Sequence, residues 1–280
     1  VGSEMCIRDR LYFDESGNPV CDEELPDFCI YWDKDVERAA MLEKCGVRVF
    51  NKSAVIELCD DKNKTFLYLS GKNIPMPETI TSPLLYPAFD DTDGLFADSV
   101  EKRLGYPMVV KEAYGSFGAQ VYLAKNRSEL DALRNRLKYM PHLYQRYVKN
   151  SSGEDIRIIV VGGKAVAAMK RKNKGDFRAN IELGGVGEKY IPSSEQVELS
   201  ERICRLLGAD YIGVDLLFDK DKTLLCEVNT NAHFMFISDC TGVDVAELYI
   251  GHVMEEIYGR ADCCLLYTSP SPRDYAASRM

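Results

Sequence analysis

Short apolar segments recur in pairs along the chain, and a polar turn or a glycine-containing loop joins the two members of each pair. Three such pairs span residues 106–124, 156–170 and 213–229. Two strands joined by a short turn run antiparallel, whereas parallel strands need a crossover of about a dozen residues or more. The pattern therefore predicts antiparallel sheets with flanking helices, an α+β fold (α/β in broad terms), rather than a doubly wound parallel sheet.

The last of these pairs carries three oxygen side chains. It reads GVDLLFDKDKTLLCEVN and contains Asp215, Glu227 and Asn229. Mg2+ takes oxygen ligands, commonly carboxylates together with nucleotide phosphates. Because side chains alternate along a strand, Glu227 and Asn229 share a face. The segment indicates a Mg-nucleotide site, although acids beside a charged turn also occur as ordinary solvated residues.

The register of this hairpin separates the two interpretations. If residues 219–222 form a four-residue turn with regular pairing, Asp215 lies opposite Cys226 and faces away from Glu227. A turn of odd length, or a β-bulge, puts the three oxygen side chains on one side. The metal hypothesis therefore predicts a turn of three or five residues, or a bulge.

Composition excludes several classes of protein. No uninterrupted apolar run exceeds five residues, whereas crossing a bilayer takes about 20, so no membrane partner is expected. A formal net charge of −9 argues against a general nucleic-acid surface. The ten cysteines form no CxxC motif and are scattered through apolar segments, which is typical of reduced thiols in a cytoplasmic protein.

The two ends differ from the rest of the chain. Residues 1–10 and 263–280 resemble translated sequencing-adapter read-through, so we expect them to be artefact tails outside the fold. Residues 11–30 are acidic and read as a solvated loop, and four prolines between 75 and 87 mark an irregular linker. Helices are predicted at 35–45, 54–58, 65–69, 129–138, 194–207 and 244–258, and further strands at 47–50 and 142–148.

Two lysines are candidates for phosphate binding. Lys111 ends the apolar segment MVVK, and the loop that follows contains Gly115 and Gly118, which let backbone amides approach a phosphate. No GK[ST] follows, so this is not a Walker A loop. Lys62 lies at the predicted start of a helix, where free amides favour an anion. A plain turn beside a surface lysine, and a solvated helix-start lysine, are the alternatives.

Charged side chains also gather in the middle hairpin. Asp155 and Arg157 alternate with isoleucines and so share one polar face, for which cross-strand ion pairing is the alternative. A cluster of cations opposes the negative charge of the chain and could hold an acidic substrate or a phosphoryl group, although most charge runs are solvated. Its members are Lys170, Arg171, Lys172, Lys174 and Arg178.

Taken in order, these segments resemble an ATP-grasp ligase of the RimK type over about residues 47–259. The resemblance rests on DKNKTFLYL, YPMVVKEAYGSFGAQVYLA, LYQRYV, GEDIRIIVVGGKAVAAMKR, GDFRANIELGG, GADYIGVDLLF and CEVNTN. It implies an ATP-grasp fold, in which two α+β subdomains with antiparallel sheets clamp ATP. It also implies a partial, truncated pre-ATP-grasp domain at 11–60 and an ATP-grasp domain at 61–262, with a small lid subdomain at about 100–148.

The resemblance also implies a role for each matching residue. Arg178 would be the catalytic residue, acting as an electrostatic stabiliser, and the metal ligands would bind two ions of Mg2+ or Mn2+. The implied ATP-binding residues are Lys62, Lys111, Gly115, Ser116, Gly118, Gln145, Arg146, Tyr147, Val148, Asp155, Arg178 and Asn180. The implied metal ligands are Asp215, Glu227 and Asn229, and the candidate substrate residues are Arg157, Lys170 and Arg171.

The implied reaction joins an amino acid such as glutamate to a carboxylate or peptide substrate through an acyl-phosphate. No protein nucleophile is evident, in keeping with phosphoryl transfer by positioned charges. Two departures stand out: residues 230–234 replace a common Ser-Pro-Gly turn, which leaves glutamate specificity open, and Arg146 stands where an acid is common. An ATP-grasp kinase, or an ATP-binding module inactivated by truncation, are the alternatives, and a homo-oligomer is left open.

Overall fold

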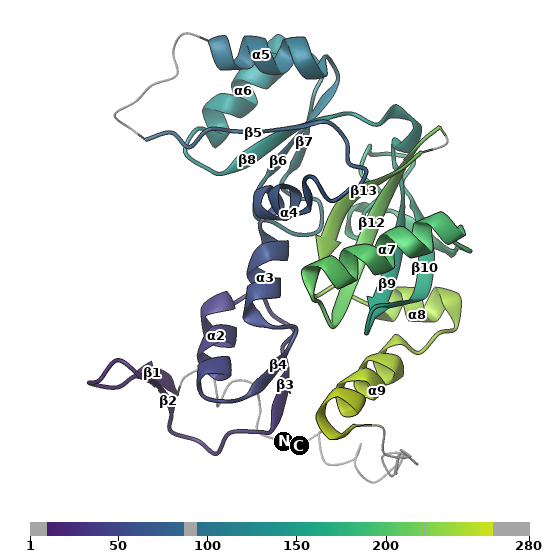
Figure 1. Ribbon diagram of the computed structural model, residues 1–280. Coiled ribbons are helices and arrows are strands. Elements are labelled where there is room, and N and C mark those ends of the chain that lie inside the picture. Colours follow the sequence, from purple (N-terminus) through teal and green to yellow (C-terminus); the bar gives the residue numbers. More distant parts are fainter. Residues whose placement is uncertain (1–9, 87–93, 221, 260–280) are drawn as a thin grey trace, which may run out of the picture.

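The computed structural model describes residues 10–86, 94–220 and 222–259. Of the two tails that the sequence predicts to be artefacts, only Arg10 lies within these ranges. The described chain forms two antiparallel sheets with a helical N-terminal region beneath them (Figure 1). None of the helices in these ranges is long and apolar enough to span a membrane.

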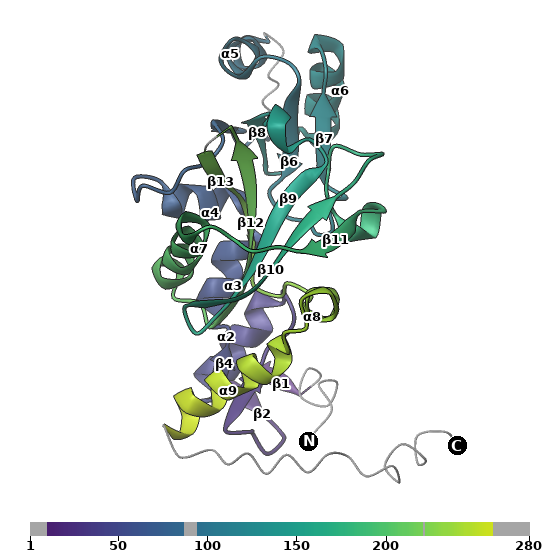
Figure 2. The same cartoon turned by 90° about the vertical axis from the view of Figure 1, so that its right-hand side faces the viewer.

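The larger sheet has five antiparallel strands with helices on both faces (Figure 2). Side chains alternate between the two faces along the central strand at Glu154–Val161. Ile158 packs with the helix at Ser194–Leu207, whereas Ile159 packs with the helices that follow the last strand. In spatial order the strands are β11 (Val186–Lys189), β10 (Lys164–Lys172), β9 (Glu154–Val161), β12 (Tyr211–Asp219) and β13 (Lys222–Asn229). The covering helices are α3 (Ser53–Asp60), α4 (Lys62–Leu69) and α7 (Ser194–Leu207) on one side and α8 (Met235–Thr241) and α9 (Val245–Tyr258) on the other.

The smaller sheet lies above the larger one in Figure 1 and has its own core. Val110 and Tyr144 from its central strands pack against Val100 and Leu130 from two helices. Its strands, in spatial order, are β5 (Thr79–Thr81), β8 (His142–Arg146), β6 (Met108–Glu112) and β7 (Val121–Ala124), all antiparallel. The helices are α5 (Leu95–Leu104) and α6 (Arg127–Leu137), and the 3-10 turn η1 (Lys149–Ser151) leads into the larger sheet.

The N-terminal region joins the larger sheet through Asn51. Its amide nitrogen donates to the carbonyl of Tyr211 over 2.7 Å, and its amide oxygen accepts from the backbone N–H of Asp210 over 2.7 Å. The region contains the hairpin β1 (Leu11–Phe13) and β2 (Pro19–Cys21), the parallel pair β3 (Phe28–Ile30) and β4 (Arg48–Phe50), and the helix α2 (Val36–Lys44).

The fold class predicted from the sequence is confirmed, but two segments predicted to be irregular contain strands. Residues 11–30 hold β1, β2 and β3 rather than a solvated loop, and the linker at 75–87 contains β5. The segment before α7, for which the sequence predicts no element, contains the 3-10 turn η2 (Ile181–Leu183) and β11. The strands among these have three or four residues and lie at sheet edges or in two-stranded pairs. Such strands owe their hydrogen bonds to a neighbouring strand, so their own sequence carries little signal.

Candidate nucleotide and metal site

A β-bulge at Cys226 brings the three oxygen side chains of the last hairpin together. Leu216 pairs with Leu225, and the next pair is Asp215 with Glu227, so Cys226 is the extra residue on β13. Directly opposite residues of an antiparallel pair lie on the same face of the sheet. The bulge that the metal hypothesis requires is therefore present, and the regular register that would separate the two acids is not.

Asp215 belongs to a buried ladder of alternating charges across three strands. The Nε of Arg157 donates to its Oδ1 over 2.7 Å, and Nη2 of Arg157 donates to its Oδ2 over 2.7 Å. Arg171 donates to the same Oδ2 over 2.9 Å and also forms two bonds of 2.6 Å with Asp155. Each buried charge thus has an opposite partner with hydrogen-bonding geometry, which offsets the cost of desolvation.

Within the ladder the pKa values of the two acids, Asp155 and Asp215, are shifted in opposite directions. Burial raises the pKa of Asp155 above its ordinary value, although Arg171 opposes the rise. Burial would also raise the pKa of Asp215, but the charges and hydrogen bonds of Arg157 and Arg171 outweigh it and lower that pKa to about 2. Asp215 therefore stays ionised at neutral pH, as a metal-binding carboxylate must.

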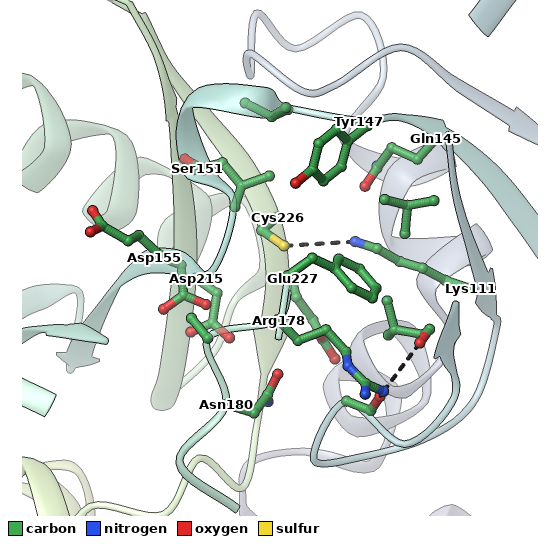
Figure 3. A pocket seen from close by; sticks show the side chains of 18 of the residues that line it. Lys111, Gln145, Tyr147, Ser151, Asp155, Arg178, Asn180, Asp215, Cys226 and Glu227 are labelled. Carbon is green, nitrogen blue, oxygen red and sulfur yellow. Dashed lines mark hydrogen bonds between the residues drawn. The ribbon is translucent and has the colours of Figure 1, made fainter. Parts of the chain in front are cut away.

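Lys111 is a buried cation that faces the pocket between the two sheets. It is 4% exposed, and its Nζ lies 3.6 Å from the Sγ of Cys226 (Figure 3). Within the described ranges no carboxylate lies within ion-pair distance of it. A thiol is a weak acceptor. Burial raises the pKa of the Cys226 thiol to about 11, although the charge of Lys111 opposes the rise, so the thiol remains neutral. A buried lysine without an anionic partner is costly on its own and suited to an anionic ligand.

Lys62 approaches the same site from the start of α4. Its Nζ lies 3.4 Å from the Oε1 of Glu227 and 3.4 Å from the carbonyl oxygen of Gly115. The side chain of Asp61 accepts from the backbone amides of residues 63 and 64 and so caps the helix. Lys62 thereby links the metal hairpin to the glycine loop between β6 and β7.

The glycine loop closes onto the larger subdomain at Gly118. This residue has a φ of 73°, and a side chain added to it would lie 2.7 Å from the Oδ1 of Asn180, so only glycine fits. The Nη1 of Arg178, labelled in Figure 3, donates to the carbonyl of Gly118 over 2.7 Å. The Nε and Nη2 of Arg178 pair with Asp176. Arg178 thus clasps the glycine loop, and its Nε, Nη1 and Nη2 all already donate to protein acceptors.

Two pockets lie side by side at this junction. Asn180 and Glu227 line both of them, so the pockets meet at these two side chains. The first pocket is lined by Val109, Lys111, Gly118, Val121, Gln145, Arg146, Tyr147, Val148, Ser151, Glu154, Asp155, Arg171, Phe177, Arg178, Ala179, Asn180, Asp215, Leu217, Cys226 and Glu227. The second is lined by Ser116, Phe117, Arg157, Asn180, Glu182, Glu227, Asn229, Asn231, Ala232 and His233.

The first pocket has the mixed lining that a nucleotide needs. Its apolar walls come from both sheets, and the segment from Gln145 to Val148 lines one side, where Gln145 and Tyr147 lie at the top of Figure 3. The exposed side chain of Arg146 turns to an ion pair with Glu78, which leaves its backbone as the part that serves the pocket. Lys170 lines neither pocket: it pairs with Glu154 over 2.6 Å and lies over the ring of Phe218.

Sequence reasoning missed several residues of the second pocket. Phe117 and His233 lie within segments that were singled out, the glycine loop and the altered stretch after Asn229, so a signal for them existed. Glu182 and Asn231 also lie within segments that were singled out, GDFRANIELGG and the altered stretch, but nothing there distinguishes them from ordinary solvated residues.

The donor atoms at this junction fit a hard divalent cation bound together with phosphates. Each oxygen of the Asp215 carboxylate has two lone pairs. Oδ2 accepts two hydrogen bonds and Oδ1 accepts one, which leaves one lone pair of Oδ1 available to a cation. Among the residues that the structure describes, Lys62 is the one cation within ion-pair distance of Glu227, and the buried amide nitrogen of Asn229 has no hydrogen-bond partner, so this amide is not committed elsewhere. Three or more His, Cys, Asp or Glu do not cluster as a self-sufficient metal site within the described ranges. The cation would therefore need Asn229 and phosphate oxygens to complete its shell.

This chain has a five-stranded and a four-stranded antiparallel sheet with buried cations and carboxylates between them. This arrangement places it in the ATP-grasp class of proteins. The family described as the RimK-like ATP-grasp domain matches residues 59–253, and the chain belongs to this family. A RimK domain ATP-grasp protein from Sphaerobacter thermophilus has a similar fold, with a TM-score of 0.66 at 21% identity over 88% of this chain and 87% of that one. The D-alanine–D-alanine ligase of Bacillus anthracis complexed with ATP has a TM-score of 0.63 at 20% identity, over 82% and 79%.

Relatives of known name are more similar in sequence. The chain is 34% identical to β-citrylglutamate synthase B of Danio rerio over 231 residues, 81% of this chain and 56% of that protein. It is 33% identical to N-acetylaspartylglutamate synthase A of Homo sapiens, over 81% of this chain and 58% of that protein. A probable alpha-L-glutamate ligase of a Marinomonas species is 30% identical over 75% and 68%. The chain thus spans just over half the length of the first two relatives.

Proposed function

We propose that the chain carries the catalytic part of an ATP-dependent carboxylate–amine ligase that forms an amide bond through an acyl-phosphate. The observation that carries the proposal is Lys111, a buried cation without a carboxylate partner among the described residues, aimed into a pocket between two sheets. The names of the relatives support it, because they are synthases and a ligase of glutamate-containing products.

The residues of the first pocket, together with the neighbouring Lys62 and Asn229, each have a task in this proposal. Lys111 and Lys62 hold the phosphates of ATP, and the backbone from Arg146 to Val148 holds the adenine. The glycine loop covers the phosphates, with Arg178 keeping it closed through Gly118. Mg2+ or Mn2+ would be held by Glu227, Asn229 and the remaining lone pair on Oδ1 of Asp215. The resemblance to the family implies two such ions. When bound, the cation offsets the negative charge of the phosphates during transfer.

The second pocket would take the carboxylate and the amine, which we propose to be an amino acid and a carboxylate or peptide. Its shared wall at Asn180 and Glu227 puts it next to the phosphate end of the first pocket. A carboxylate oxygen attacks the γ-phosphorus, and ADP leaves. The amine nitrogen then attacks the acyl carbon and loses a proton, and phosphate leaves. The cytoplasmic location is part of this proposal and rests on the seven free cysteines of the described ranges.

A substrate panel tests the proposal. Pairs of amino acids and carboxylates, including short acidic peptides, are incubated with ATP and Mg2+, and ADP release and hydroxylamine-trapped acyl-phosphate are measured. Release of ADP that depends on both substrates, with a trapped hydroxamate, supports the ligase. A stable phospho-product without a hydroxamate points to a kinase instead. Binding of Mg-ATP without turnover by any pair points to a module that binds nucleotide only.

A further inference from the structure

We propose that Phe117 and His233 form a ring gate over the second pocket that favours small free substrates over the chain ends of longer peptides. This inference rests on the proposed function and names the size class of its substrates. The two rings lie edge to face, with centroids 5.7 Å apart and an interplanar angle of 83°. Such a contact is a favourable aromatic arrangement, so it holds the two loops together.

The position of the rings places the gate at the mouth of the pocket. Of the residues that line the second pocket, Phe117, Glu182 and His233 are exposed, whereas Ala232 and Arg157 lie deeper. The second pocket meets the first at the half-buried Asn180 and Glu227. A substrate whose reacting group lies at this shared wall must therefore fit beneath the rings or extend out between them.

One side of the gate is fixed to the larger sheet. The hydroxyl of Tyr211 donates to the carbonyl of Ala232 over 2.6 Å, and Ala232 packs onto Gly213, where an added side chain would lie only 2.4 Å away. The carbonyl of Thr230 accepts from the amide nitrogen of Asn51 over 3.3 Å. These contacts anchor the loop that carries His233, so this ring stays where the sheet places it.

The other side of the gate is carried by the glycine loop. Phe117 lies between Ser116 and Gly118 and has a φ of 58°, a left-handed conformation that a bulky side chain adopts at a cost. It is 49% exposed, so burial of its own ring does not explain its position. The contact with His233 and the hydrogen bond from Arg178 to the carbonyl of Gly118 help to hold this part of the loop closed.

The test compares small substrates with lengthened forms of the same molecules. The best pair from the substrate panel is used, and each partner in turn is replaced by a form two residues longer at the end remote from its reacting group. In the unaltered protein we expect the lengthened form to lower kcat/KM at least about tenfold, as steric exclusion from a shaped pocket does. Phe117→Ala and His233→Ala should each remove most of this difference.

Two further variants serve as controls. Phe117→Leu keeps most of the bulk and should retain the discrimination. Tyr114→Ala removes a ring from the same loop with the same 49% exposure, but Tyr114 lines neither pocket, so the ratio should not change. The ratio of kcat/KM values for short and lengthened substrates is taken at saturating ATP, so that a change in ATP affinity in a variant does not alter it. Equal turnover of short and long substrates by the unaltered protein, or an unchanged ratio in Phe117→Ala, overturns the gate.

Binding of both forms by calorimetry separates this inference from the proposed function. A protein that binds the short form more tightly, loses this preference in Phe117→Ala and releases no ADP has the gate but not the proposed ligase activity. A protein that turns over both forms equally has the activity but not the gate. Failure to bind either form overturns both.

Discussion

Asp215 lies directly opposite Glu227, although the regular register of their hairpin would pair Asp215 with Cys226. The bulge does two things at once. It puts both carboxylates on the pocket face of the sheet, and it presents Cys226 as a neutral neighbour of Lys111. The bulge thereby places the carboxylates of Asp215 and Glu227 beside Lys111, which has no carboxylate partner among the described residues. Such an uneven distribution of charge suits a divalent cation bound together with phosphate.

Glu227→Gln should abolish Mg-dependent ATP turnover, a loss of at least about 100-fold, because the amide removes a charge where phosphoryl transfer needs a bound cation. The fold should be unaffected, since glutamine has the same shape and, within the described part of the chain, Glu227 has one close charged partner, Lys62. ADP release and the thermal melting temperature are measured together. Glu188→Gln, an exposed acid paired with Lys172 far from the pocket, is the control and should change neither. Full turnover in Glu227→Gln would remove this residue from the metal site.

Asp215→Asn should destabilise the protein by about 3 kcal/mol at pH 7, because Arg157 and Arg171 would lose their shared buried carboxylate. The pKa of Asp215 is lowered in the folded state to about 2, from 3.8. Its contribution is therefore complete above about pH 4 and is lost as the pH falls towards 2. Urea unfolding of both proteins between pH 7 and pH 2 should show the difference narrowing only below about pH 4. A difference that stays constant to pH 2 would contradict the ladder, and Asp239→Asn, an exposed acid, should show no difference at any pH.

Much of this site could be predicted from the alternation of side chains along strands. The metal hypothesis required a bulge or an odd turn, and the structure has the bulge. The segment from Lys170 to Lys172 also follows the alternation of side chains along a strand. As a run of cations it suggested one basic surface, but strand alternation sends Arg171 inwards to Asp155, while Lys170 and Lys172 pair with acids on the other face. A strand that continues through Lys172 predicts that Arg171 and the two lysines lie on opposite faces of the sheet.

Other features depend on partners that are distant in the sequence. The ion pair of Arg157 with Asp215 joins two strands 58 positions apart, and β5 is a strand only because β8 lies beside it. The contact between Phe117 and His233 likewise needs both subdomains to be in place. Local propensity cannot specify such pairs, because their energy appears only when the chain has closed the intervening loops.

Lys111→Ala should weaken ATP binding by about tenfold to 100-fold, the loss expected when a charge-assisted hydrogen bond to phosphate is removed. Isothermal titration with ATP and Mg2+ measures it. Lys170→Ala is the matched control, because that lysine is held by Glu154 and the ring of Phe218 and lines neither pocket. If both variants bind ATP as the unaltered protein does, Lys111 does not contact the phosphates.

Gly213→Ala should destabilise the protein by about 1–3 kcal/mol, because the added methyl group would overlap with Ala232 at 2.4 Å in a packed core. The strain falls on the loop that carries His233, so ATP affinity should change less than discrimination between short and lengthened substrates. Gly251→Ala is the control: nothing lies within 4 Å of that position in α9, and alanine favours a helix by about 0.5–1 kcal/mol over glycine, so this variant should be slightly more stable. Denaturant unfolding of the two variants gives the comparison. If Gly213→Ala is as stable as the unaltered protein, Ala232 is free to move, and the loop at 230–233 cannot be the fixed side of the gate.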